Sequence, residues 1–337
     1  MLTSRERVLC ALHHEEPDRV PVFFGATGST SIHAKGYDKI KKRLGIQSET
    51  KLISRADRYT LLDRQAIEHY GGDGIPFYAK AAPSTLSKVI SEEAFIDEWG
   101  IRWQQEPGGV YFSPPYKGMP LESATLDDIE KYPWPQVAHP SRFAGIREEV
   151  RKLRETTDYA IIGSIGPNTV EKIMHLRGLE NTMMDMAMNQ DFFQALLGKI
   201  TSLMVEATDK FLDEVGEYID IFLMGDDMGT QNAPMFSPQM YRELVKPSHA
   251  ALVDKVHQKS KAKIFFHSCG DVYPLIGDLI DVGVDLLNPV QVAAKDMGDT
   301  ARLKREFGDR ISFCGGIDTQ TVLPKGTPAE VRAEVRR

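Results

Sequence analysis

A histidine and a cysteine two residues apart, His267 and Cys269, are the residues of this sequence best suited to bind a metal ion. They close an apolar run at 263–267 that predicts a buried strand. Side chains two apart on a strand share a face, so the imidazole and the thiolate would project together. One nitrogen and one sulfur ligand form a half-site that suits zinc. A hydrogen-bonded histidine beside a small apolar cysteine is the alternative, and the strand-end position leaves both open.

Two adjacent carboxylates, Asp226 and Asp227, follow the preceding apolar run at 219–224. Such a pair at the rim of an active site can bind a cation, orient an N–H-bearing ligand, or act as acid and base. One of them could instead cap the loop or helix that follows. Both are candidate catalytic residues, and we expect one to be functional and one structural. Asp226 is preferred because it is nearer the strand.

A third candidate zinc ligand is Cys314, at the end of the apolar run 311–314. It lies two predicted strands from His267, which is roughly 10 Å at the backbone. Zinc–sulfur bonds of about 2.3 Å require the two thiolates to be much closer than that. Cys314 is therefore either a ligand or a residue that lines the barrel.

Loops after the predicted strands supply candidate substrate-binding residues. The glycine-rich segment 163–168 has neither the glycine spacing of a dinucleotide fingerprint nor the lysine of a phosphate loop. It predicts a tight turn that lets a ligand approach the backbone. From this segment and other strand-end loops, the candidates are Gly28, His33, Asn168, Gln231 and Asn288.

The elements that must position these residues alternate between buried strands and amphipathic helices. Thr3 and Glu6 have the spacing of a capping box at the start of a first helix, and a long amphipathic helix begins near Asn189. Most of the apolar runs lack polar alternation, which is typical of parallel strands buried on both faces. The predicted strands are 19–25, 74–78, 159–166, 219–224, 263–267, 284–287 and 311–314.

Alternating strands and helices predict βαβ units and a parallel sheet. The predicted fold class is α/β, a (β/α)₈ TIM-type barrel whose active site would lie at the carboxyl ends of the strands. Only seven strands are visible, and closure would need roughly 30 further residues after 337. The last strand is thus expected to be absent from this chain.

The sequence predicts a single barrel domain over 1–337, interrupted at about 83–140. That stretch is rich in glycine, proline and tryptophan and lacks the helix–strand alternation of its surroundings. It predicts an excursion of short antiparallel strands and turns that covers one end of the barrel. A separate domain is less expected, because the stretch lacks the apolar mass for its own core.

Composition narrows the classes of partner. The net charge of -7 and the lack of a long basic run argue against nucleic acid or an anionic membrane surface. No signal peptide and no apolar stretch of roughly 18 residues is visible. Three cysteines are too few for a disulfide framework. A cytoplasmic protein that acts on a small molecule is expected, and a homodimer is left open.

Several segments, in the same order, resemble the uroporphyrinogen decarboxylase superfamily. They are 4–7, 17–22, 178–181, 237–241, 246–247 and 315–319. The resemblance extends over essentially the whole chain, and it implies the (β/α)₈ barrel that the strand pattern predicts independently.

The resemblance implies two competing activities. True decarboxylases of this family carry paired arginines after the first strand, which hold the carboxylates of a highly anionic porphyrinogen. The corresponding segment 25–33 contains no arginine, so the charge-assisted clamp is missing. Arginines from other loops, such as Arg102 or Arg177, could restore it.

The methyltransferase branch instead has a His-x-Cys pair and a distant cysteine that bind zinc. His267 and Cys269 match the pair, and the third cysteine would come from the strand that this chain lacks. The resemblance therefore implies zinc, and methyl transfer from methylcobamide on a corrinoid protein to a thiol or folate acceptor. The alternatives are uroporphyrinogen decarboxylase and a protein that binds a tetrapyrrole or corrinoid without turnover.

Overall fold

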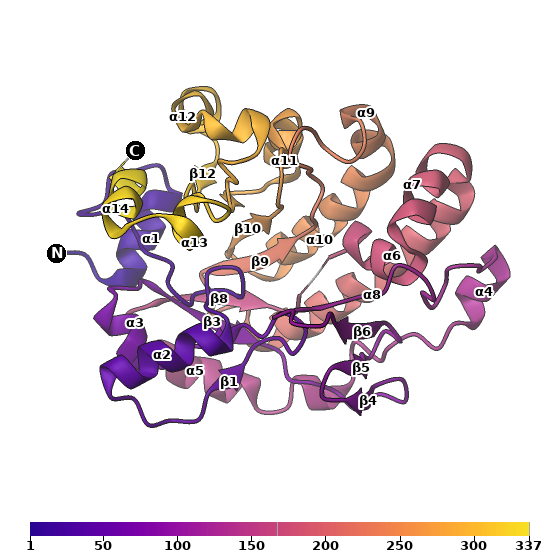
Figure 1. Ribbon diagram of the computed structural model, residues 1–337, viewed down its shortest axis with the longest axis horizontal. Coiled ribbons are helices and arrows are strands. Elements are labelled where there is room, and N and C mark those ends of the chain that lie inside the picture. The colour runs from indigo at the N-terminus through magenta and orange to yellow at the C-terminus, as the bar shows by residue number, and fades with distance from the viewer. Residues whose placement is uncertain (167, 337) are drawn as a thin grey trace.

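A six-stranded parallel sheet forms the centre of the protein (Figure 1). The computed structural model describes residues 1–166 and 168–336. The strand order is β12-β11-β10-β9-β8-β3, and every neighbouring pair is parallel. The carboxyl ends of all these strands therefore meet at one edge of the sheet. The strands are β3 (Gly74–Tyr78), β8 (Ala160–Ser164), β9 (Ile221–Gly225), β10 (Lys263–His267), β11 (Leu286–Asn288) and β12 (Ser312–Phe313).

Helices separate the strands along the chain. The longer ones are α1 (Ser4–Leu12), α2 (Ala34–Leu44), α5 (Ile146–Thr156), α6 (Val170–Arg177), α7 (Leu179–Met188), α8 (Gln190–Val215), α10 (Lys246–Lys259), α12 (Thr300–Phe307) and α14 (Pro328–Arg336). The shorter ones are α3 (Arg64–His69), α4 (Leu126–Lys131), α9 (Pro238–Met240), α11 (Ile276–Val282), α13 (Val322–Lys325), η1 (Pro140–Arg142), η2 (Tyr241–Val245), η3 (Tyr273–Leu275) and η4 (Lys295–Gly298). Among the described residues, no helix is both long enough and apolar enough to cross a lipid bilayer.

The alternation of side chains along the strands gives the sheet two buried faces. One face of the sheet packs on α8 and α10, where Phe211 of α8 contacts Phe222 of β9 with ring centroids 6.5 Å apart. The other face encloses a smaller cluster that α1 covers. Its buried residues include Val8, Leu12, Ile162, Ile221, Phe265 and Leu286. Phe265 belongs to this enclosed face, so His267, two residues later on β10, is directed to the same side.

The α/β class and the parallel sheet are confirmed, whereas the first predicted strand is wrong. Residues 19–25 form no strand, although they lie beside β3: the Asp73 backbone N–H donates to the Val22 carbonyl at 2.7 Å. Pro21 lacks an N–H group, and the N–H of Val22 donates to the Asp73 side chain at 2.8 Å, so no regular ladder develops. In the part of the chain described, β3 and β12 are the edge strands, and closure into a barrel stays a prediction.

Residues 83–140 contain a separate four-stranded antiparallel sheet in the order β4-β5-β6-β7 (Figure 1). Its strands are β4 (Lys88–Ser91), β5 (Ala94–Ile96), β6 (Arg102–Gln105) and β7 (Phe112–Ser113). Trp103 of β6 packs edge-on against His175 of α6, with ring centroids 5.2 Å apart. A short hairpin of β1 (Lys51–Leu52) and β2 (Thr60–Leu61) precedes this sheet.

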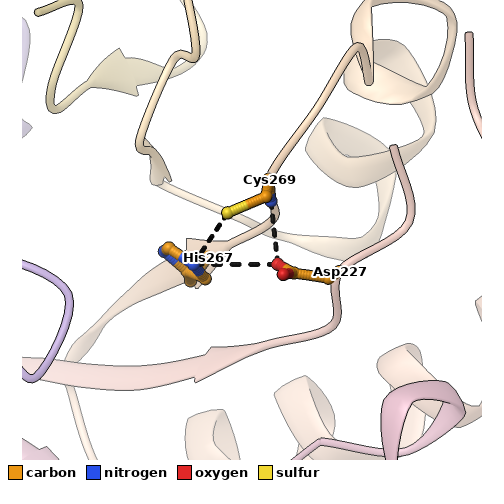
Figure 2. A group of neighbouring side chains, drawn as sticks. All are labelled: Asp227, His267 and Cys269. Carbon is orange, nitrogen blue, oxygen red and sulfur yellow. Dashed lines mark hydrogen bonds and ion pairs between the residues drawn. The ribbon is translucent and has the colours of Figure 1, made fainter. Parts of the chain in front are cut away.

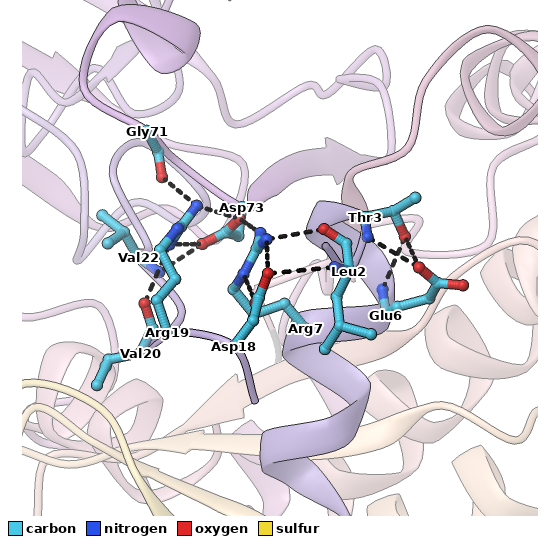
Figure 3. A network of polar contacts seen from close by, with 10 residues as sticks. All are labelled: Leu2, Thr3, Glu6, Arg7, Asp18, Arg19, Val20, Val22, Gly71 and Asp73. Carbon is cyan, nitrogen blue, oxygen red and sulfur yellow. Dashed lines mark hydrogen bonds and ion pairs between the residues drawn. The ribbon is translucent and has the colours of Figure 1, made fainter. Parts of the chain in front are cut away.

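An ion-pair network around Asp73 fixes the N-terminal segment to the start of β3 (Figure 3). Asp73 is fully buried. Its carboxylate accepts hydrogen bonds from Arg7 at 2.7 Å and from Arg19 at 2.7 and 2.9 Å. Arg7 also donates to Asp18 at 2.6 Å. The network lies at the amino end of the strand, where interactions serve stability rather than chemistry.

Replacing Asp73 with asparagine is expected to lower the free energy of unfolding by about 3 kcal/mol, because Arg7 and Arg19 lose the buried carboxylate that they share, and Arg7 keeps only Asp18 as a charged partner. Urea-induced unfolding would measure the change. Glu16→Gln, an exposed substitution in the same segment, is the matched control and should change stability by less than about 0.5 kcal/mol. Equal stability of the two variants would contradict the conclusion that the Asp73 network stabilises the fold.

Candidate functional site

A cavity of about 720 Å³ lies at the carboxyl ends of the strands. Four of its lining residues, Tyr78, Ser164, Gly225 and His267, are the last residues of β3, β8, β9 and β10. Loops at 28–31 and 53–59 supply further lining residues. This is the edge of a parallel α/β sheet at which ligands usually bind.

Asp227, His267 and Cys269 form a cluster at this cavity (Figure 2). The Cys269 Sγ lies 3.5 Å from the His267 Nε2, and that nitrogen lies 3.7 Å from the Asp227 Oδ1. One ligand atom from each residue can be chosen so that all three lie within 4.8 Å of one another. Nitrogen, sulfur and carboxylate oxygen are all ligands that zinc accepts.

Glycines allow the two loops that carry this cluster to approach each other. The Cys269 backbone N–H donates to the Asp227 Oδ1 at 2.8 Å, which joins the loop after β10 to the loop after β9. Gly270 has a φ of +84°, and a Cβ there would overlap the backbone of Gly229. Side chains larger than hydrogen at these positions would therefore separate Asp227 from Cys269.

Asn288 fixes the orientation of the His267 ring. It is buried at the end of β11, and its Oδ1 lies 2.6 Å from the His267 Nδ1. Because a carbonyl oxygen only accepts, Nδ1 carries the proton, and the lone pair of Nε2 is directed toward Asp227 and Cys269. Predicted as a substrate-binding residue, Asn288 does not line the cavity and instead supports His267, as residues behind metal ligands do.

The charge balance of the cluster suits a cation. Burial, and then the negative charge of Asp227, raise the pKa of the Cys269 thiol to about 12. Without a positive charge nearby, the thiol would therefore keep its proton at neutral pH. A divalent cation would stabilise both the carboxylate and the thiolate. The donor set and its electrostatics therefore fit zinc.

Cys314 is not brought into this cluster. Its Sγ lies 3.7 Å from the Asn288 Nδ2, and its backbone carbonyl accepts from the same group at 3.1 Å. Burial raises the pKa of the Cys314 thiol to about 11. The structure therefore places Cys314 behind Asn288, beside the cluster rather than in it.

Asp226 lies behind the cavity wall, unlike its neighbour Asp227. It is 1% exposed. Its carboxylate accepts from the Thr169 N–H at 2.9 Å, the Glu171 N–H at 2.8 Å and the His249 Nε2 at 2.9 Å. Burial acts to raise the pKa of Asp226, but these hydrogen bonds, that of His249 first, bring it below its ordinary value. The geometry favours Asp227 for chemistry and Asp226 for holding the start of α6.

Of the other candidate residues, some line the cavity and others lie outside it. Gly28 and Asn168 line the cavity. His33 lies at the start of α2, with its Nε2 3.0 Å from the Val110 carbonyl, and is not a lining residue. Gln231 is exposed outside the cavity. Within the predicted turn at 163–168, residue 167 lies outside the described residues.

Sequence reasoning missed several residues of the cavity wall. Glu171 lies in the first turn of α6, and burial, and then the charges of Asp227 and Asp226, raise its pKa to about 7. Tyr78 is the last residue of a predicted strand, and its position at the carboxyl end of that strand could have identified it as a candidate. Asp57 and Tyr59 come from the β1–β2 hairpin, which carried no such signal.

No lysine or arginine is among the lining residues in the part of the chain that the structure describes. Arg177 is buried elsewhere, where it donates to Asp185 at 2.8 Å and to the Leu121 carbonyl at 2.9 Å. Arg102 lies on β6, exposed, and donates to Gln104 at 3.2 Å. Neither arginine restores the clamp that an anionic porphyrinogen would need.

Comparison with known proteins agrees with the resemblance seen in the sequence. The uroporphyrinogen decarboxylase (URO-D) family model matches residues 93–337. Methylcobamide:CoM methyltransferase MtaA of Methanosarcina barkeri is 22% identical over 340 residues, which cover 99% of this chain and 88% of that protein. A methyltransferase from Methanosarcina mazei shares the fold, with a TM-score of 0.63 at 17% identity over 100% of this chain and 89% of that one. The family match spans well over half of the sequence, and the chain belongs to the uroporphyrinogen decarboxylase family.

Proposed function

We propose that this protein is a zinc-dependent methyltransferase that moves a methyl group from a methylcobamide, carried by a corrinoid protein, to a thiol or folate acceptor. The cluster of Asp227, His267 and Cys269 beside a 720 Å³ cavity carries the proposal. The M. barkeri relative supports it, since that protein is a methylcobamide:CoM methyltransferase.

Asp227, His267 and Cys269 would hold the zinc ion. When bound, zinc supplies a Lewis acid that lowers the pKa of an acceptor thiol to near neutrality. The His267 Nε2 would be free to bind the metal, because Asn288 holds the opposite nitrogen. Glu171, a carboxylate on the cavity wall, is suited to receive the proton of the acceptor thiol. The acceptor sulfur then forms the new S–CH₃ bond, while both electrons of the cobalt–carbon bond remain with the corrinoid.

The charge of the cavity argues against the decarboxylase alternative. Asp57, Glu171 and Asp227 line it, and no lysine or arginine of the described chain does. A porphyrinogen with many carboxylates would meet like charges in a partly buried site, where repulsion is weakly screened. Methyl transfer to a small acceptor does not require basic residues that hold many carboxylates.

Metal analysis and a demethylation assay on the purified protein test the proposal. We expect about one zinc per chain, and thiol-dependent demethylation of methylcobalamin that a chelator removes and added zinc restores. Conversion of uroporphyrinogen to coproporphyrinogen by a zinc-free protein would establish the decarboxylase instead. Corrinoid or porphyrin binding without zinc and without either turnover would indicate a non-catalytic binding protein.

Asn288→Ala is expected to weaken zinc binding by about 10–100-fold, because the His267 ring loses the partner that fixes its tautomer and orientation. Competition with a chromophoric chelator would measure the affinity. Asn232→Ala, an exposed asparagine in the loop after β9, is the matched control. Wild-type affinity in Asn288→Ala would show that the hydrogen bond does not support the metal site.

A further inference from the structure

The wall of the cavity combines aromatic rings with carboxylates. Tyr59, Tyr78 and Tyr111 line it, together with the carboxylates of Asp57 and Glu171. The rings of Tyr59 and Tyr111 are arranged edge to face, with centroids 6.4 Å apart. Burial, and then the charge of Asp57, raise the pKa of Tyr59 to about 12, so its ring remains neutral. Electron-rich ring faces beside carboxylates form a surface that attracts cations.

Hydrogen-bond acceptors on this wall lack donors. The Asn168 Nδ2 donates to the Glu171 Oε2 at 2.9 Å, whereas the Asn168 Oδ1 is buried and has no partner among the described residues. The second oxygen of Glu171 lies 4.0 Å from the His175 Nε2, too far for a hydrogen bond. Burial lowers the pKa of His175 to about 4, so this ring carries no charge at neutral pH. A buried acceptor without a donor is costly, which indicates a ligand N–H group at this place.

A cation from the protein itself does not fill this role. Lys172, which follows Glu171, lies over the ring of Trp99, 5.0 Å from its centroid, and is not a lining residue. A zinc ion held by Asp227, His267 and Cys269 would balance the carboxylate and the thiolate of that cluster. It would leave Asp57 and Glu171 without a lysine or arginine beside them among the described residues that line the cavity.

We propose that the small-molecule substrate of this cavity carries a cationic amine. The proposal rests on the proposed function and specifies the chemistry of its acceptor. The amine would lie against the tyrosine rings and donate to Asn168 and Glu171, while its thiol reaches the metal cluster. An acceptor with an anionic head group would instead face Asp57 and Glu171, with no lysine or arginine among the described lining residues to receive it.

Three thiols of similar size and different charge test the inference on zinc-loaded protein: 2-aminoethanethiol, 2-mercaptoethanol and 2-mercaptoethanesulfonate. Calorimetry should show that the aminothiol binds about tenfold or more tighter than the sulfonate, with the uncharged thiol between them. The sulfonate is CoM, the acceptor in the name of the M. barkeri relative. The same measurements therefore test whether this protein prefers CoM. Equal or tighter binding of the sulfonate would overturn the inference.

A second pair of ligands separates this inference from the zinc-dependent function. Propylammonium and propanesulfonate lack the thiol, and ligand-observed NMR with metal-free protein would compare their binding. Preference for the ammonium ion should persist there and decrease in Glu171→Gln and Asp57→Asn. It should be unchanged in Glu130→Gln, an exposed substitution on α4. A protein that binds no zinc but prefers the ammonium ion would defeat the proposed function alone. Preference for the sulfonate in the wild type would defeat the inference, whatever the zinc content.

Discussion

His267→Ala and Cys269→Ser should each reduce zinc affinity by more than about 100-fold and bring methylcobamide demethylation to background. Even the loss of a residue that only orients a metal ligand costs about 10–100-fold, and these two residues would contact the metal directly. Both are partly exposed at the cavity, so neither substitution creates a large void in the core. Chelator competition and demethylation of methylcobalamin measure the two effects, and urea-induced unfolding verifies the fold.

The other cysteines provide matched controls. Cys10→Ser, on α1 and outside the cavity, should retain full zinc affinity. Cys314→Ser should weaken zinc binding by less than about tenfold, because its sulfur contacts Asn288 rather than the cluster. Zinc content and demethylation equal to wild type in His267→Ala would leave His267 a structural residue and remove the main support for the methyltransferase. A loss in Cys314→Ser as large as that in Cys269→Ser would instead make Cys314 a ligand.

Asp226→Asn is expected to lower the free energy of unfolding by about 3–5 kcal/mol, whereas Asp227→Asn should change it by less than about 1 kcal/mol. In the first variant, an amide NH₂ replaces one of two oxygens that both accept from backbone N–H groups. Two donors would then face each other in a fully buried site, and His249 would lose a charged partner. Asp227 lies at the cavity, where water can solvate the change.

Zinc affinity should show the opposite pattern to stability: it should fall in Asp227→Asn and stay nearly unchanged in Asp226→Asn. Asp227→Asn replaces a charged ligand with a neutral amide oxygen that can still coordinate, and we therefore expect about 10–100-fold weaker zinc binding, less than in His267→Ala, from a protein of normal stability. Asp226→Asn should bind zinc with near wild-type affinity under conditions in which it remains folded. Urea-induced unfolding and chelator competition on both proteins measure the contrast. A stable, zinc-deficient Asp226→Asn beside an unstable, zinc-competent Asp227→Asn would reverse the assignment.

The pattern of apolar runs in the sequence was sufficient to predict the parallel sheet. Six predicted strands are present, in parallel and in sequential order. Strands buried on both faces form short continuous apolar runs, which differ in length and periodicity from the amphipathic helices between them. The segment 19–25 has a similar apolar composition but forms no strand. Whether such a run pairs depends on the backbone groups beside it, and here Pro21 and the side chain of Asp73 remove the donors that a ladder requires.

By itself, the sequence also determined that the His267 and Cys269 side chains would lie together and that the segment 25–33 offers no arginine to an anionic substrate. Both conclusions rest on local geometry and composition, which do not depend on distant parts of the chain. Only the tertiary structure decided between Asp226 and Asp227. The side chains of consecutive residues point in different directions. Which of the two aspartates contacts α6 and α10, and which faces the cavity, depends on how the helices pack on the sheet. In the same way, the charge of the cavity and the support of His267 by Asn288 come from segments far apart in sequence, because the carboxyl ends of parallel strands meet only in the folded sheet.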